Sequence, residues 1–147
     1  MKAIITVTIA FCALPGLALA APKHFPAGRP GAPAPAYSAA VEDGDMLYVS
    51  GTADGTDPAT GKPPVDAKTG AKVVLNSVQK ILEKAGYTMD DLVWVQIFTT
   101  DLKYYGDFND VYRTYFKGPL PARAFLGTAN LLGNAHFEVM GIAVKQK

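Results

Sequence analysis

Reactive side chains and metal ligands are scarce in this chain. It has 147 residues, of which one is cysteine and two are histidine. The single thiol, Cys12, cannot form a disulfide within the chain. His24 and His136 lie far apart in the sequence, and no group of histidine and acidic residues has the spacing of metal ligands. We therefore expect no metal and no other cofactor.

The chain also lacks an excess of charge. Its 14 basic and 13 acidic residues give a formal net charge of +1, and the basic residues form no run. Neither nucleic acid nor an anionic membrane is therefore an expected partner. A glycine-rich phosphate loop is missing too, because the segment from Gly51 to Gly55 contains no lysine and no helix is expected directly after it.

The first twenty residues have the features of a secretory signal peptide. Lys2 precedes an apolar run from Ala3 to Leu14, and Ala18-Leu19-Ala20 is a small-x-small cleavage site. The run is short and is followed by a Pro-Gly pair, which disfavours a membrane span; an uncleaved N-terminal anchor is the alternative. We expect the protein to be exported, to the periplasm or outside the cell, and to lose residues 1–20 with its only cysteine. The intact mass of the protein from its native compartment tests this cleavage.

The mature chain is expected to begin with an extended arm. Residues 21–35 contain five prolines, a composition typical of a linker without regular structure. The remaining residues, 36–147, have the length of one domain.

That domain is predicted to contain two helices and five strands. The first helix begins after Asp66, a favourable N-cap, and ends at Gly86; the second begins after Asp107 and ends at Gly118-Pro119. The run at 92–100 has little alternation, which predicts burial on both faces. The order β-β-α-β-α-β-β predicts an α+β fold in which two helices cover one face of a single sheet. Apolar runs place the strands at 37–42, 46–50, 92–100, 122–129 and 136–144.

The other face of this sheet has no cover within one chain. Apolar strand residues would face outward there, and association with further copies is a common way to bury such a surface.

A lone arginine, Arg123, stands where a proline-rich turn enters an apolar strand. Guanidinium is always charged and presents a planar fork of donors that matches a carboxylate or phosphate. A small anionic ligand is one candidate partner. A structural ion pair with a neighbouring aspartate or glutamate is the other.

Five motifs occur in order between Ala34 and Val144, nearly the whole mature chain. Together they resemble the reactive intermediate deaminase family, Rid, also called YjgF. The motifs are Tyr37-Ser38-Ala39-Ala40-Val41, Gly44-Asp45-Met46-Leu47-Tyr48-Val49-Ser50-Gly51, Phe108-Asn109-Asp110-Val111-Tyr112-Arg113-Thr114-Tyr115-Phe116, Pro121-Ala122-Arg123 and Glu138-Val139-Met140-Gly141-Ile142-Ala143.

The resemblance implies an assembly and an activity. The assembly is a homotrimer with a barrel-like, chorismate-mutase-like core and with ligand clefts between subunits. The activity is enamine/imine deamination, in which a small 2-imino acid is hydrolysed to a 2-oxo acid and ammonia without a cofactor. Arg123 would hold the substrate carboxylate, and the further substrate contacts would come from Tyr37, Ser50, the Gly51 backbone, Asn109 and the Phe125 backbone.

Each of these further contacts has a structural alternative. Tyr37 could be an amphipathic residue at the edge of the core, Asn109 could serve a helix N-terminus, and Ser50 could satisfy a turn. His136, at the start of the last strand, could act as a base near pH 7 or could simply be a half-exposed strand-end residue.

The last strand departs from the family pattern. Family members that act on imines usually have Glu-x-Glu-x-Ile-Ala there, and alignment on Ile142-Ala143 puts Met140 at the second glutamate, which orients the attacking water. Glu138 remains, but it stands roughly 6.6 Å away along the strand, so it could position the water only with a different geometry. This leaves two rivals to the deaminase: a non-catalytic trimer that binds small carboxylates through Arg123, and a structural trimer without a ligand.

Overall fold

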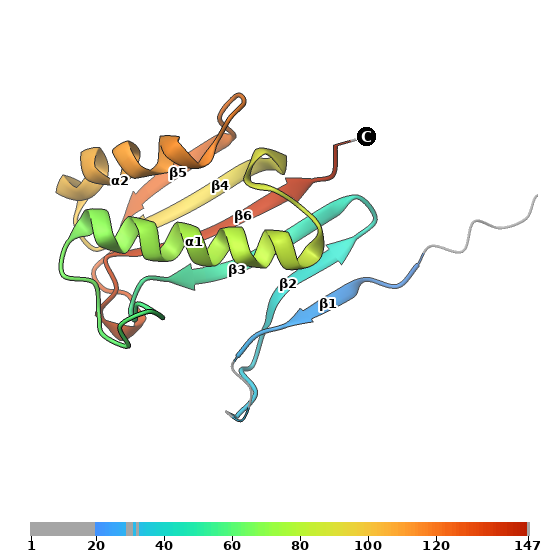
Figure 1. Ribbon diagram of the computed structural model, residues 1–147, viewed down its shortest axis with the longest axis horizontal. Helices are drawn as coiled ribbons and strands as arrows, with labels where there is room; N and C mark the ends of the chain where they lie inside the picture. The colour runs from blue at the N-terminus through green and yellow to red at the C-terminus, as the bar shows by residue number, and fades with distance from the viewer. Residues whose placement is uncertain (1–19, 29–30, 32, 147) are drawn as a thin grey trace, which may run out of the picture.

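One mixed six-stranded sheet carries both helices on the same face, as Figure 1 shows. The computed structural model describes residues 20–28, 31 and 33–146, so the predicted signal peptide lies outside the described residues except for Ala20. The strands follow the order β1-β2-β3-β6-β4-β5, and only the β4–β5 pair is parallel. The predicted α+β fold is confirmed. The elements are β1 (Lys23–Pro26), β2 (Ser38–Asp43), β3 (Met46–Ala53), α1 (Ala67–Ala85), β4 (Leu92–Thr99), α2 (Tyr105–Tyr112), β5 (Ala122–Gly127) and β6 (Phe137–Val144), with short 3-10 turns at Met89–Asp91, Leu102–Tyr104, Arg113–Tyr115 and Leu132–Asn134.

The sixth strand corrects the prediction for the N-terminal arm. Residues 21–35 were expected to have no regular structure, but β1 lies within them and pairs antiparallel with β2. Phe25 is the anchor, because its side chain is buried in the core. Pro26 ends the strand with a shift in register, which is tolerated because β1 is the edge of the sheet.

Helix α1 has the ends that the sequence predicts. The Asp66 side chain accepts a hydrogen bond from the Thr69 backbone N–H at 2.7 Å, and this bond lowers the pKa of Asp66. Gly86 ends the helix in the left-handed conformation, with φ of 82°. The buried stripe of the helix consists of Ala67, Gly70, Ala71, Val73, Val74, Leu75, Val78, Leu82 and Ala85.

The second helix begins differently from the prediction. Asp107 does not cap it; α2 starts at Tyr105 and continues from a 3-10 turn that Asp101 caps by accepting a bond from the Lys103 backbone N–H at 2.9 Å. An aspartate is favoured both at the cap and in the first turn, where Asp107 lies, so composition alone does not separate the two positions. The predicted buried side is correct and includes Phe108, Val111 and Tyr112.

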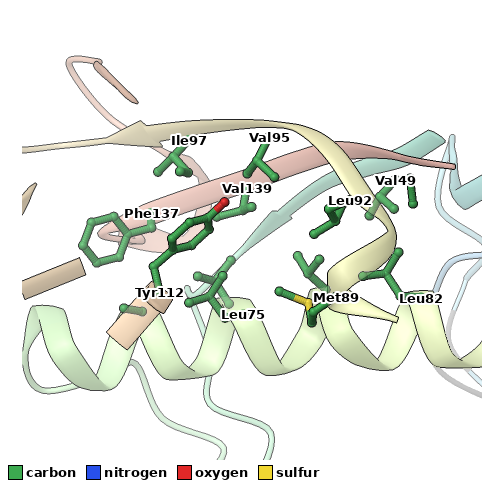
Figure 2. Close-up of a cluster of buried hydrophobic side chains, with 14 of the residues drawn as sticks. Val49, Leu75, Leu82, Met89, Leu92, Val95, Ile97, Tyr112, Phe137 and Val139 are labelled. Carbon is green, nitrogen blue, oxygen red and sulfur yellow. The ribbon is translucent and has the colours of Figure 1, made fainter. Parts of the chain in front are cut away.

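The core fills the space between the helices and the sheet, as Figure 2 shows for the central part. Phe137 of β6 lies at one end of it, fully buried against Phe108 and Phe125, with ring centroids 4.8 and 6.5 Å away. These aromatic contacts join α2 to β5 and β6. They fix α2 over β5, the edge strand that contains Arg123.

The opposite face of the sheet is open in a single chain. Tyr48 and Leu126 are 44% and 41% exposed, and the neighbouring apolar side chains on this face are only half-buried. Strand β4 therefore alternates between core and open face, and the prediction that it is buried on both faces is wrong for one chain. The described helices include none that is both long and apolar enough to cross a membrane.

Candidate functional site

Arg123 points from β5 toward the helix-covered side of the sheet. Its register partner on β4 is Val95, a core residue, and α2 lies over it. The guanidinium carbon lies 4.9 Å from the ring centroid of Tyr112, 5.6 Å from that of Tyr105 and 5.8 Å from that of Phe125. Three aromatic faces therefore surround the guanidinium, an arrangement that stabilises a cation without neutralising it.

No carboxylate neutralises Arg123 in the described part of the chain. Its one described polar contact is a donation from Nη2 to the Tyr105 hydroxyl at 3.5 Å, and no acidic side chain lies within 4.0 Å. The structural ion pair considered above is thus not found among these residues. The guanidinium keeps donors available for an anion.

Arg123 lines a small hollow between α2 and the start of β5, which we call the arginine hollow. Its volume is about 140 Å³. Asn109 also lines it, and hydrogen bonding by the Asn109 side chain lowers the pKa of the nearby Tyr105 hydroxyl, with the charge of Arg123 as the second cause. The lining residues are Asn109, Tyr112, Arg113, Leu120, Pro121 and Arg123.

A second group of predicted residues gathers around a β-bulge in β3, and we call it the bulge group: Ser50, Gly51 and Glu138. The β3–β6 register shifts between Val49 and Thr52, so Ser50 and Gly51 are outside the regular ladder. A bulge of this kind frees backbone polar groups for other partners. Glu138 of β6 covers Gly51 so closely that a Cβ on this glycine would collide with the carboxylate Oε1.

The side chains of Ser50 and Tyr37, two of the predicted substrate contacts, differ in their surroundings. Ser50 donates from Oγ to the Ser38 carbonyl at 2.7 Å, so its hydroxyl holds β2 to β3. Tyr37 comes directly before β2 and its side chain is 60% exposed. The structural alternative for Ser50 therefore has support, and Tyr37 is not part of the core.

The arginine hollow and the bulge group do not meet within one chain. Arg123 shares the core face with Val95, whereas Glu138 is in register with Phe98 on the other face. Strands β3 and β5 are also three strand spacings apart in the sheet, which is about 14 Å. The structure thus brings Arg123, Asn109 and Phe125 together on one side, and Ser50, Gly51 and Glu138 on the other.

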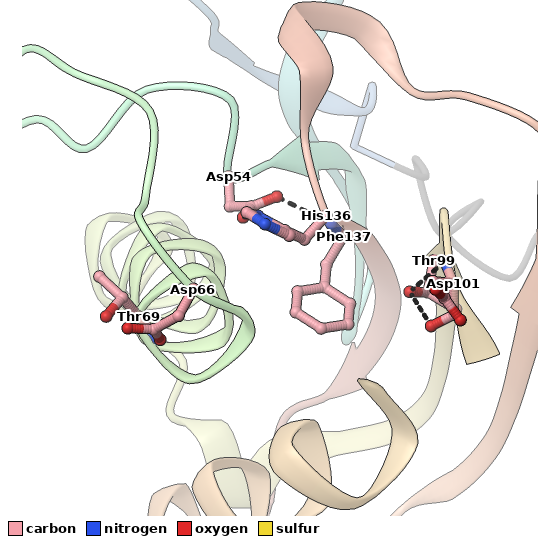
Figure 3. Close-up of polar contacts among 7 residues, drawn as sticks. All are labelled: Asp54, Asp66, Thr69, Thr99, Asp101, His136 and Phe137. Atoms are coloured by element: carbon pink, nitrogen blue, oxygen red, sulfur yellow. Dashed lines mark hydrogen bonds and ion pairs between the residues drawn. The ribbon is translucent and has the colours of Figure 1, made fainter. Parts of the chain in front are cut away.

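His136 has a partner that the sequence did not predict. Its Nδ1 lies 3.0 Å from Oδ2 of the fully buried Asp54, which also accepts the Phe137 backbone N–H at 2.8 Å, as Figure 3 shows. The Tyr104 ring packs against the imidazole in a T-shaped arrangement, with the two ring centroids 5.5 Å apart. His136 is therefore held in a polar cluster between the end of β3 and the start of β6, which neither of the two alternatives for this residue included.

Helical spacing could have revealed further residues near Arg123. Tyr105 and Arg113 are four positions before and after Asn109, and Tyr112 is three positions after it, so they lie on one side of α2.

Among the residues with a described placement, no group of three or more histidine, cysteine or acidic side chains could hold a metal ion.

The comparisons with known proteins agree with this fold. The model of the family described as Endoribonuclease L-PSP matches residues 28–145, and the chain belongs to this family, which includes the Rid/YjgF proteins.

The similar proteins come from distant organisms. A RutC family protein of Aquifex aeolicus is 38% identical over 120 residues, which cover 79% of this chain and 95% of that protein. The 2-iminobutanoate/2-iminopropanoate deaminase of Mus musculus is 36% identical over 110 residues, which cover 74% of this chain and 81% of the mouse protein. The structure of E. coli TdcF with bound serine has a TM-score of 0.74 at 30% identity and covers 84% of this chain and 100% of TdcF.

Proposed function

We propose that this protein hydrolyses small 2-imino acids to 2-oxo acids and ammonia, and that Arg123 binds the substrate carboxylate. The observation that carries the proposal is the half-buried guanidinium of Arg123, which lies among three aromatic rings and has no described acidic partner. The mouse relative is named for this reaction, and E. coli TdcF was solved with serine, which is itself a small amino acid.

The reaction needs positioning more than strong activation, because a protonated imine carbon is already electrophilic. Water oxygen attacks this carbon, and the π electron pair of the C=N bond moves to nitrogen. A proton of the water passes to a carboxylate base, which gives a neutral carbinol bearing an amine. The base returns the proton to nitrogen and then takes the hydroxyl proton as the C–N bond breaks and C=O forms. Ammonia leaves and accepts that proton, so the products are the 2-oxo acid and ammonium.

Glu138 is the residue that we assign as this base. Its carboxylate lies against Gly51, whose backbone is outside the regular ladder and can contact the substrate. Met140 stands two positions along the same strand, in register with Gln96, and its thioether cannot accept the proton. The contact between the Glu138 carboxylate and Gly51 supports this assignment.

A complete site requires a second copy of the chain in this proposal. Arg123 and Glu138 are on opposite faces of one sheet, so the Glu138 that acts on a substrate held by Arg123 belongs to a neighbouring subunit. The open sheet face, with Tyr48 and Leu126, would be buried in the same contact. We expect a homotrimer, and light scattering at micromolar concentration measures it. A monomer under these conditions would contradict the shared site.

Ammonia release tests the function directly. Freshly generated 2-iminopropanoate and bulkier 2-imino acids are mixed with the mature protein, and ammonia is measured against buffer and against an unrelated protein. Faster release than in both controls is the expected result. Binding of 2-oxo acids without turnover would instead identify a non-catalytic carboxylate-binding trimer, and absence of both would identify a structural one.

A further inference from the structure

The arginine hollow contains two guanidinium groups. Arg113 directly follows α2 and lines the hollow together with Arg123, which comes from β5. Two positive side chains therefore border the same small space. Neither guanidinium has an acidic partner within 4.0 Å among the residues with a described position. Two like charges without counter-ions repel each other, and a dianion would relieve this repulsion.

A buried tyrosine also lines the hollow. The Tyr112 side chain lines the hollow, its residue is only 2% exposed, and its hydroxyl has no hydrogen-bond partner within the described chain. Figure 2 shows this hydroxyl directed from α2 into the core, toward the sheet. The part of Tyr112 that lines the hollow is therefore its ring, with the guanidinium carbon of Arg123 4.9 Å from the ring centroid.

The remaining wall is apolar and the space is small. Leu120 and Pro121 precede β5 and close the hollow on one side. Its volume of about 140 Å³ is well below the ~300–1,000 Å³ typical of sites for drug-sized ligands. A short carbon chain with an anionic group at each end matches this combination of two cations, an apolar wall and limited volume.

We propose that the preferred substrate is a 2-imino dicarboxylic acid, whose second carboxylate is bound by Arg113. This inference rests on the proposed function, because Arg123 holds the first carboxylate in both. It adds the substrate class: imines derived from acidic amino acids are bound better than those with an uncharged side chain.

Two product-like ligands of equal chain length separate this inference from the function itself. We compare 2-oxoglutarate with 2-oxopentanoate, which lacks only the second carboxylate, by calorimetry on the assembled mature protein. Wild type is expected to bind 2-oxoglutarate at least about tenfold more tightly, the size of one charge-assisted hydrogen bond. Arg113→Gln should remove this preference and should weaken the binding of 2-oxopentanoate far less. Lys80→Gln, which removes one exposed charge on α1 away from the hollow, should preserve the preference.

Equal affinity for the two ligands, or a preference that survives Arg113→Gln, would overturn the dicarboxylate assignment while the carboxylate site at Arg123 stands. Failure to bind either ligand would overturn both.

Discussion

Replacement of Glu138 by glutamine is expected to lower kcat for 2-iminopropanoate by about 10²–10⁴-fold, the usual contribution of a general base. Glutamine has nearly the same shape and covers Gly51 in the same way, but it cannot take a proton from water. The affinity for a 2-oxo acid should change little, since Arg123 still binds the carboxylate. Ammonia release under saturating imine, with calorimetry for pyruvate, measures the two quantities separately.

Met140→Glu is the matched variant for this prediction. It places a carboxylate at the position where the family pattern has its second glutamate. If Glu138 positions the water, Met140→Glu should leave turnover near the wild-type level and should not restore the Glu138→Gln variant. A wild type that binds but barely turns over, with a Met140→Glu form that is clearly faster, would show that the missing second glutamate limits this protein.

Replacement of Arg123 by alanine is expected to weaken binding of pyruvate or 2-oxobutanoate by well over tenfold. Loss of one member of a buried charged pair typically costs about 2–5 kcal/mol. Arg123→Lys should also bind poorly, because it keeps the charge but loses the bidentate fork. Calorimetry on both variants measures these affinities, and light scattering confirms that the assembly is unchanged.

The stability of the ligand-free protein provides the contrast for Arg123. A stacked cation over an aromatic ring contributes about 0.5–1 kcal/mol at a partly exposed site, and no described ion pair is lost with Arg123. The melting temperature should therefore fall only modestly in Arg123→Ala. A large loss of stability with unchanged ligand affinity would mean that Arg123 has a structural role only.

Local signals in the sequence were reliable where one helix or one turn decides the outcome. Helix α1 begins after Asp66 and ends at Gly86 because of contacts within a few residues of each end. In the same way, Asp43-Gly44-Asp45 connects β2 to β3 as a tight hairpin. Strand β1 was missed because its evidence is nonlocal: only pairing with β2 and burial of Phe25 order a segment whose composition resembles a linker.

The candidate site likewise has one feature that the local sequence predicts and others that it does not. Arg123 was identified from its own chemical context, a charge at the entrance of an apolar strand. Its aromatic surroundings and the second arginine depend on how α2 lies over β5, which local patterns do not specify. The contact between Glu138 and Gly51 likewise depends on a register shift between distant strands, so the water-positioning role could not be separated from the Met140 alternative before the strand pairing was known.

The extra residue in the β3 bulge changes which side of the sheet each later residue of the strand faces. On β3, Val49 pairs with Gly141 and Thr52 with Val139, so three steps along one strand match two along the other. After the bulge the even-numbered residues face inward, which is why Asp54, whose N–H still bonds the Phe137 carbonyl at 3.2 Å, is fully buried beside His136. Deletion of one residue between Val49 and Thr52 would make the two strands match step for step and leave Asp54 buried, so the change would remove only the irregular backbone that lies beside Glu138.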